Sequence, residues 1–333
     1  MAIAPTEIGL KSTPEFRVPP EGRADTFAQR SFASRLLRHP LARVGIAIIA
    51  LLFLVAVFAG FLTPYDQTQI LPGGIGALGE PHAPGGGFPI GADSLGRDVW
   101  TRTLFGTRIS LLVGVFAMMS AVTIGTTIGL ISGYCGGWVD AVLMRLTEIV
   151  IALPTVLLAI ALAAVLPDKA ENLPRFLNFL WSGLRVLLPK ELEQVKLFNL
   201  LLAIALVTWT GIARAVRGEV LSLKQREFVE AARAAGCSQG RIIWRHLLPN
   251  VLPTIIVLAT LATANNILLE AGLSFLGLGV DPSTPSWGGT IAEGQPYVLS
   301  APWILLAPGI AIVLAVTGFN LLGQALQETI QKQ

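Results

Sequence analysis

Charged side chains are scarce in this sequence. Asp, Glu, Lys and Arg make up 14% of the 333 residues, whereas 53% are hydrophobic, and the mean hydropathy is +0.66. Soluble globular domains carry about 25% charged residues. The deficit excludes an ordinary soluble domain and places the chain among membrane proteins.

Cysteine and histidine are also rare. The two cysteines, Cys135 and Cys237, are too few for a disulfide framework, and both fall in segments that we expect in the cytosol, where thiols stay reduced. The three histidines, His39, His82 and His246, are scattered along the chain. Because a zinc site needs three or four clustered ligands, no metal site is expected.

A phosphate-binding loop is missing as well. No lysine follows a glycine anywhere, which excludes the G-x-x-x-x-G-K-[ST] motif, and the Gly85–Gly87 run is followed by Phe88. No pairing of a nucleophile with a base can be recognised either. We therefore expect no catalytic residues, no cofactor bound by this chain and no enzyme activity of its own.

Long apolar segments are what the sequence has in abundance. A helix needs about 20 residues to cross the hydrocarbon of a bilayer, and helices satisfy their own backbone hydrogen bonds there. The first segment follows a long polar tail and lacks a cleavage site, so we expect it to be retained. The sequence predicts an all-α integral membrane protein with six transmembrane helices, at residues 44–62, 108–132, 146–166, 198–216, 250–272 and 303–325.

The polar tail before the first span has two parts. Residues 1–26 have a composition typical of disorder. Residues 27–39 combine apolar side chains with several arginines, which is typical of a helix that lies in the membrane interface. Pro40 is expected to break this helix before the first span.

The distribution of Lys and Arg predicts the orientation, because cytosolic loops are enriched in these residues. With both termini in the cytosol, the inside segments hold two thirds of the 24 Lys and Arg residues. Residues 63–107 and 167–197 are then extracytoplasmic. The first is rich in Gly and Pro and is expected to be a loop. The second contains FLNFLWSGL, which predicts a short interfacial helix or, alternatively, a re-entrant piece.

Ionisable residues are nearly absent from the predicted spans. Glu148 and Glu270 lie near span ends, where each could face an inner cavity or sit at the interface. Ion-coupled carriers usually bury acidic groups along their path, so the chain is expected to be a passive channel or a subunit driven by a partner. Glycines such as Gly114, Gly125 and Gly129 predict close helix packing, without indicating the partner helix.

Residues 227–253 form an organised polar segment between two predicted spans. Residues 227–235 favour a helix, Gly236 can end it, and Ser238 or Gln239 can begin a second helix. This predicts a helix–turn–helix at the membrane surface, suited to docking another protein.

The spacing in this segment resembles the EAA motif of ABC importer permeases, E-A-A-x₃-G-x₉-I-x-L-P. His246 stands where the general motif has Ile, and the local R-H-x-L-P-N form is similar to the dipeptide/oligopeptide/nickel branch. Four other stretches also resemble that branch, so the chain resembles DppC/OppC-type permease subunits over residues 30–328. The stretches are GADSLGRD at 91–98, YCGGWVD at 134–140, SFLGLG at 274–279 and PSWG at 285–288.

The resemblance implies a type I ABC importer permease (MetI-like) fold in the bacterial cytoplasmic (inner) membrane. Four regions follow from it. They are a cytosolic tail with an interfacial helix (1–43), the first transmembrane helix with its extracytoplasmic loop (44–107), an ABC transmembrane type-1 domain with the EAA loop at 227–253 (108–325), and a cytosolic C-terminus (326–333).

The resemblance also implies partners and site residues. The partners are a homologous DppB/OppB-type permease, two ABC ATPases that use ATP and Mg, an extracytoplasmic substrate-binding protein and membrane lipid; no nucleic acid is expected. The residues implied in coupling to the ATPases are Glu230, Ala231, Ala232, Gly236, Leu248 and Pro249. Candidates for the entrance or translocation path are Asp93, Arg97, Asp98, Glu148 and Glu270.

The function expected from the resemblance is import of di- or oligopeptides, driven by ATP hydrolysis in the partner subunits. The same fold could instead import nickel chelates or other small solutes. Two alternatives of a different class stay open, an autonomous channel or secondary carrier, and a membrane anchor without transport.

Overall fold

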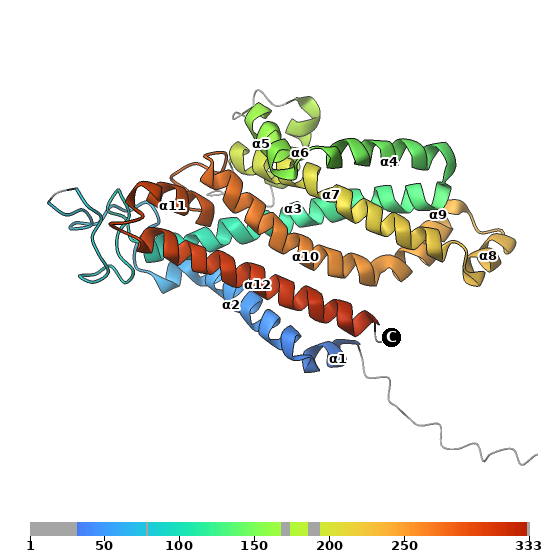
Figure 1. The fold of residues 1–333 in the computed structure, drawn as a ribbon, viewed down its shortest axis with the longest axis horizontal. Helices are drawn as coiled ribbons and strands as arrows, with labels where there is room; N and C mark the ends of the chain where they lie inside the picture. Colours follow the sequence, from blue (N-terminus) through green and yellow to red (C-terminus); the bar gives the residue numbers. More distant parts are fainter. Residues whose placement is uncertain (1–31, 78, 168–173, 186–193, 332–333) are drawn as a thin grey trace, which may run out of the picture.

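The computed structural model describes residues 32–77, 79–167, 174–185 and 194–331. In this part of the chain the regular elements are helices, accompanied by isolated β-bridges. Figure 1 shows an elongated bundle of long helices. The long helices are α2 (Pro40–Leu62), α3 (Val99–Cys135), α7 (Val195–Leu223), α10 (Leu248–Phe275) and α12 (Trp303–Gln331). The shorter elements are α1 (Phe32–Arg38), α4 (Gly137–Ala152), α5 (Thr155–Val165), α6 (Arg175–Arg185), α8 (Glu227–Ala234), α9 (Gln239–Ile242), η3 (Ile243–Leu247), α11 (Trp287–Gly294) and η4 (Gln295–Tyr297).

Five helices of the described residues are long and apolar enough to cross a membrane, and a sixth span is formed if α4 and α5 are counted together. The sequence predicted one helix over residues 146–166, but the two pieces meet at a bend of 93°. The cause is the Leu153–Pro154 pair. Pro154 offers no N–H to the helix, and Leu153 before it is held in an extended conformation.

Helix α3 begins at Val99, well before the predicted start at residue 108. Asp98 caps it, because its Oδ2 accepts a hydrogen bond of 2.8 Å from the Thr101 N–H. Charged residues around the predicted start have partners within the fold. Arg108, for example, donates to the backbone carbonyl oxygens of Ala56 and Val57 at the end of α2.

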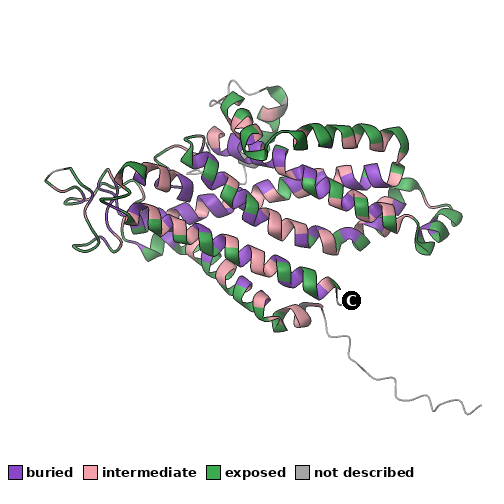
Figure 2. Ribbon diagram, in the orientation of Figure 1, coloured by how far each residue is buried: buried purple, intermediate pink, exposed green. Residues whose placement is uncertain are grey.

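Helices α3 and α7 form the centre of the bundle, and glycines bring them together. A Cβ atom at Gly125 would lie 2.6 Å from the carbonyl oxygen of Trp209, and one at Gly129 would lie 2.7 Å from that of Ala213. Gly114 lies in the same way against Ile267 of α10. The prediction of close packing is therefore confirmed, and the partner helices are α7 and α10. Figure 2 shows buried residues concentrated on α3 and α7, whereas α4 is largely exposed.

The elements divide between the two ends of the bundle (Figure 1). Helix α1, the end of α12 and the α8–α9 segment lie at one end, while the loop of residues 63–98 and α11 lie at the other. This is the division that the predicted orientation requires. Helix α6 confirms the short helix predicted within residues 167–197. Residues 168–173 and 186–193 of that segment, and the disorder predicted for residues 1–26, fall outside the described residues.

Candidate functional site

Helix α8 carries the EAA sequence and presents two different faces. Val229 and Ala232 are buried, with exposed fractions of 0% and 7%, and they pack in the apolar cluster formed with α7, α9 and α10. Glu230 and Ala231 are exposed on the other face. The helix is thus anchored on the bundle by one side and shows an acidic residue and small side chains on the other.

Gly236 ends this helix as the sequence predicted. Its φ of +76° lies in the left-handed region, which glycine adopts without steric cost. Its N–H donates to the carbonyl oxygen of Arg233 over 2.9 Å, and the next N–H, of Cys237, donates to that of Ala232 over 3.1 Å. Ser238 then caps α9, because its Oγ accepts from the Arg241 N–H.

The second helix, which the sequence predicted to begin at Ser238 or Gln239, continues directly into the next span. After α9 the chain makes one π-helical turn, η3, and continues directly into α10. The N–H of Leu248 donates to the carbonyl oxygen of Ile243, five residues earlier. Pro249 has no N–H for an α-helical bond, and the Asn250 Nδ2 instead donates to the His246 carbonyl oxygen over 2.6 Å. Of the remaining motif residues, Leu248 is partly buried and Pro249 is exposed.

The YCGGWVD stretch lies next to the EAA segment. The guanidinium carbon of Arg233 is 5.4 Å from the ring centroid of Tyr134, a cation–π contact. Asp140 accepts two hydrogen bonds of 2.6 Å from the Arg217 guanidinium, which joins α4 to α7. Lys224 donates to the carbonyl oxygen of Gly133 over 2.8 Å. These contacts hold the turn between α3 and α4 against the end of α7, just before α8.

The GADSLGRD stretch lies at the opposite end and forms a buried charge cluster with α3 and α11. Asp93 is fully buried, and its Oδ2 accepts a hydrogen bond of 2.6 Å from the Nε of Arg97. Arg97 and Arg102 both donate to the carboxylate of Glu293, over 2.6 Å and 2.9 Å. Asp98 belongs to the α3 cap described above. The structure therefore brings Asp93, Arg97 and Asp98 together, and all three are buried within the fold.

Arg102 and the pairing with Glu293 are the parts of this cluster that the sequence did not reveal, although the predicted entrance loop at residues 283–295 contains Glu293. Glu293 is 191 positions from Arg102, so no local pattern indicates the pair. The one available signal was Arg102 itself, because it lies just before the predicted span at residues 108–132. Such a residue requires a partner, because an unpaired buried charge is costly.

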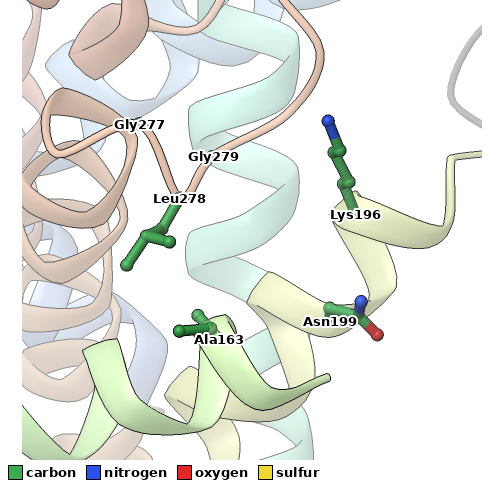
Figure 3. Close-up of a pocket in the computed structure, with 7 residues that line it drawn as sticks. Ala163, Lys196, Asn199, Gly277, Leu278 and Gly279 are labelled. Atoms are coloured by element: carbon green, nitrogen blue, oxygen red, sulfur yellow. The ribbon is translucent and has the colours of Figure 1, made fainter. Parts of the chain in front are cut away.

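Two cavities that share lining residues lie at this end of the bundle, and the second borders the charge cluster. The first has a volume of about 250 Å³, and Figure 3 shows Lys196, Asn199 and the Gly277–Gly279 turn around it. The second has a volume of about 280 Å³ and shares Lys196 and that turn. The other charged residues that line it are Arg102, Asp281 and Glu293.

The SFLGLG and PSWG stretches build the wall of these cavities. Gly277 has a φ of +81°, which reverses the chain after α10. Trp287 is fully buried, and its Nε1 donates to the carbonyl oxygen of Thr103 on α3 over 3.2 Å. Lys196, which lines both cavities, forms an ion pair of 2.8 Å with Asp281. Three of the motif stretches thus converge at one end of the bundle and two at the other.

The two acidic residues predicted near span ends lie apart from each other. Glu148 is 63% exposed and forms an ion pair of 3.2 Å with Arg145. Glu270 is fully buried in α10, where its Oε1 accepts a hydrogen bond of 2.7 Å from Ser274. Its Oε2 has no partner with ordinary hydrogen-bond geometry in the described part of the chain. Within the same part, no cluster of three His, Cys, Asp or Glu residues could hold a metal ion.

Comparison with known proteins identifies the family. Residues 125–333 match the family described as "Binding-protein-dependent transport system inner membrane component". The chain belongs to this family. Residues 26–75 also match "N-terminal TM domain of oligopeptide transport permease C". Membership in this inner membrane component family confirms the predicted class, a transporter's membrane component rather than an enzyme.

Individual relatives match over nearly the whole chain. The dipeptide transport system permease protein DppC of Alkalihalophilus pseudofirmus is 38% identical over 320 residues, which cover 96% of this chain and 95% of the relative. The glutathione transport system permease protein GsiD of Pectobacterium atrosepticum is 36% identical over 301 residues, or 90% of each chain. GsiD of Escherichia coli O157:H7 is 36% identical over 299 residues, covering 90% and 88% of the two chains. The resemblance to DppC/OppC-type permeases is thereby confirmed.

Proposed function

We propose that this chain is the permease subunit of an ABC importer that moves peptides across the bacterial inner membrane. The observation that carries the proposal is the extent of the similarity to permeases named for dipeptide and glutathione transport. Glutathione is itself a small peptide. In this assignment the energy comes from ATP, used with Mg by two ATPase subunits that dock on this chain and on a second, homologous permease.

The exposed face of α8 is the proposed ATPase contact. Val229 and Ala232 fix the helix on the bundle. A movement of the ATPase against Glu230 and Ala231 would therefore move the bundle together with α8. The path inward runs through α9 and η3 into α10 without a break. Because α10 reaches the far end of the bundle, movement of α8 would shift the end of α10 that lies beside the two cavities.

The opposite end is the proposed entrance. The charge cluster fixes the loop of residues 63–98 on α11, which gives a substrate-binding protein a firm surface to dock on. The second permease is proposed to pack on the exposed apolar face of α4, where Val142, Leu146 and Ile149 are 50–57% exposed. This arrangement takes α4 and α5 as the sixth span and places both termini in the cytosol, as the Lys and Arg distribution favours.

The ATPase contact is tested by charge reversal on α8. We expect Glu230→Arg to abolish peptide uptake and copurification of the ATPase subunits, because it reverses the charge at the contact and leaves the buried face intact. Gly236→Pro should have the same effect through the left-handed turn. The measurements are uptake of labelled peptide by the reconstituted complex and the amount of ATPase retained on purification.

Glu80→Arg is the matched control, since Glu80 is exposed on the loop at the other end of the bundle. It should leave ATPase copurification unchanged. Wild-type uptake with bound ATPase in the Glu230→Arg complex would show that α8 is not the docking element.

A further inference from the structure

A cavity lies where α1 meets the end of α12. Its volume is about 400 Å³, and it is lined by Arg35, Arg38, His39, Pro40 and Thr329. Helix α1 contacts both α2 and α12 there, as Figure 1 shows at the end of the bundle that carries the C-terminus. Three of the five lining residues are therefore basic, and they come from the segment just before the first span.

In the described part of the chain, basic side chains outnumber carboxylates around this cavity. Among the described residues, no carboxylate pairs with Arg35 or Arg38. Glu328 lies at the edge and pairs instead with the Nε2 of His39, over 3.1 Å. The Nε of Arg35 and the Nδ1 of His39 are buried without a hydrogen-bond partner in the described part of the chain. The Nε–H of Arg35 is a donor, and a buried donor without a partner costs free energy, so this cavity favours a ligand with acceptor oxygens.

The position of the cavity restricts the kind of ligand that it can bind. Helix α2 begins at Pro40 and is the most apolar of the five single-helix spans in the described residues. Val44 and Leu51 on α2 and Leu37 on α1 are more than half exposed, which suits contact with acyl chains. The basic cavity thus lies at the height where the apolar surface begins, which is the level of lipid phosphates. Guanidinium groups match phosphate oxygens in geometry as well as in charge.

We propose that this cavity binds the phosphate headgroup of an anionic phospholipid. Arg35 and Arg38 contact the phosphate, and an acyl chain follows the exposed face of α2. The bound lipid would hold α1 in place and link α2 to α12 at the membrane surface. It goes beyond the transport function and does not depend on the substrate; only its assignment to the cytosolic leaflet rests on the proposed orientation.

The test measures lipid retention on the full chain. Purified, delipidated protein is titrated with phosphatidylglycerol or phosphatidylcholine, and bound lipid is counted by native mass spectrometry. We expect tight binding of one phosphatidylglycerol in wild type and about tenfold weaker binding in the Arg35→Gln/Arg38→Gln variant, from the loss of charge-assisted bonds. Arg241→Gln/Arg245→Gln is the control, because it removes two exposed arginines from the same end of the bundle and should retain the lipid.

Three results would overturn the proposal. Equal losses in both double variants would mean general surface attraction rather than a site. Equal retention of phosphatidylcholine would remove the anionic preference. Binding of inorganic phosphate alone, with displacement of phosphatidylglycerol by it, would make the cavity a free-anion site.

A second measurement on wild type does not depend on the folding of a variant. A photoactivatable phosphatidylglycerol is expected to label peptides that contain residues 32–43 or 325–331. Labelling only in other parts of the chain would contradict the assignment.

Discussion

Asp93 is a fully buried carboxylate with two guanidinium groups for neighbours, those of Arg97 and Arg102. It also accepts backbone hydrogen bonds of 2.9 Å from Leu95 and Arg97 at Oδ1. One side chain therefore fixes both the conformation of its own loop and the position of α3. Sequence motifs singled out Asp93, Arg97 and Asp98, but their burial depends on Glu293, which is 196 positions from Arg97. The residues could be predicted, whereas their environment could not.

Asp93→Asn tests this cluster at the residue scale. The change keeps the shape but leaves two buried guanidinium groups with one carboxylate, so we expect a loss of about 3 kcal/mol in stability, typical of breaking a buried ion pair. Thermal unfolding of the purified protein in detergent measures it. Glu148→Gln removes an exposed partner of Arg145 and should cost at most about 1 kcal/mol. Equal unfolding midpoints for the two variants would mean that the cluster adds nothing to stability.

At the scale of elements, hydropathy predicted which segments become helices but not where they end or bend. Most of the predicted spans extend further in the structure, because caps and buried pairs accommodate polar residues beyond the apolar core. The bend after α4 was readable from Leu153–Pro154 inside the predicted third span. The π turn before Pro249 had a weaker signal, a proline followed by an asparagine that can bond backward.

The contact of α3 with α7 gives an element-scale prediction. Gly129→Ala would place a Cβ atom 2.7 Å from the Ala213 carbonyl oxygen, so the two helices must separate. We expect a loss of about 1–3 kcal/mol, typical of overpacking, measured as a lower unfolding temperature in detergent.

Gly218→Ala on α7 is the matched control, since a Cβ there meets no described atom within 4 Å. Alanine favours helix over glycine, so this variant should be neutral or slightly more stable. A Gly129→Ala protein as stable as Gly218→Ala would refute close packing at this contact.

At the scale of the whole molecule, the orientation in the membrane connects the two ends to their partners. Cys135 is exposed and Cys237 partly so, and both belong to the end proposed to face the cytosol. We expect a permeant maleimide to label them in spheroplasts and an impermeant maleimide to leave them unmodified. Labelling is measured by the mass shift of the purified protein.

A cysteine at the other end provides the opposite control. Leu299 is 95% exposed, so Leu299→Cys in a background with both native cysteines replaced by alanine should react with the impermeant reagent. Reaction of Cys135 with that reagent, and protection of the new cysteine, would invert the topology.

The π turn at Ile243–Leu247 also determines which residues of α9 and α10 share a helix face. Each residue of an α-helix rotates the chain by about 100° and advances it by about 1.5 Å. The π turn takes up one extra residue, so each residue of α10, Glu270 included, stands one position later in the chain than continuous α-helical spacing from α9 would place it. Deleting one residue here would restore α-helical spacing between α9 and α10 and leave the two helices in nearly the same orientation.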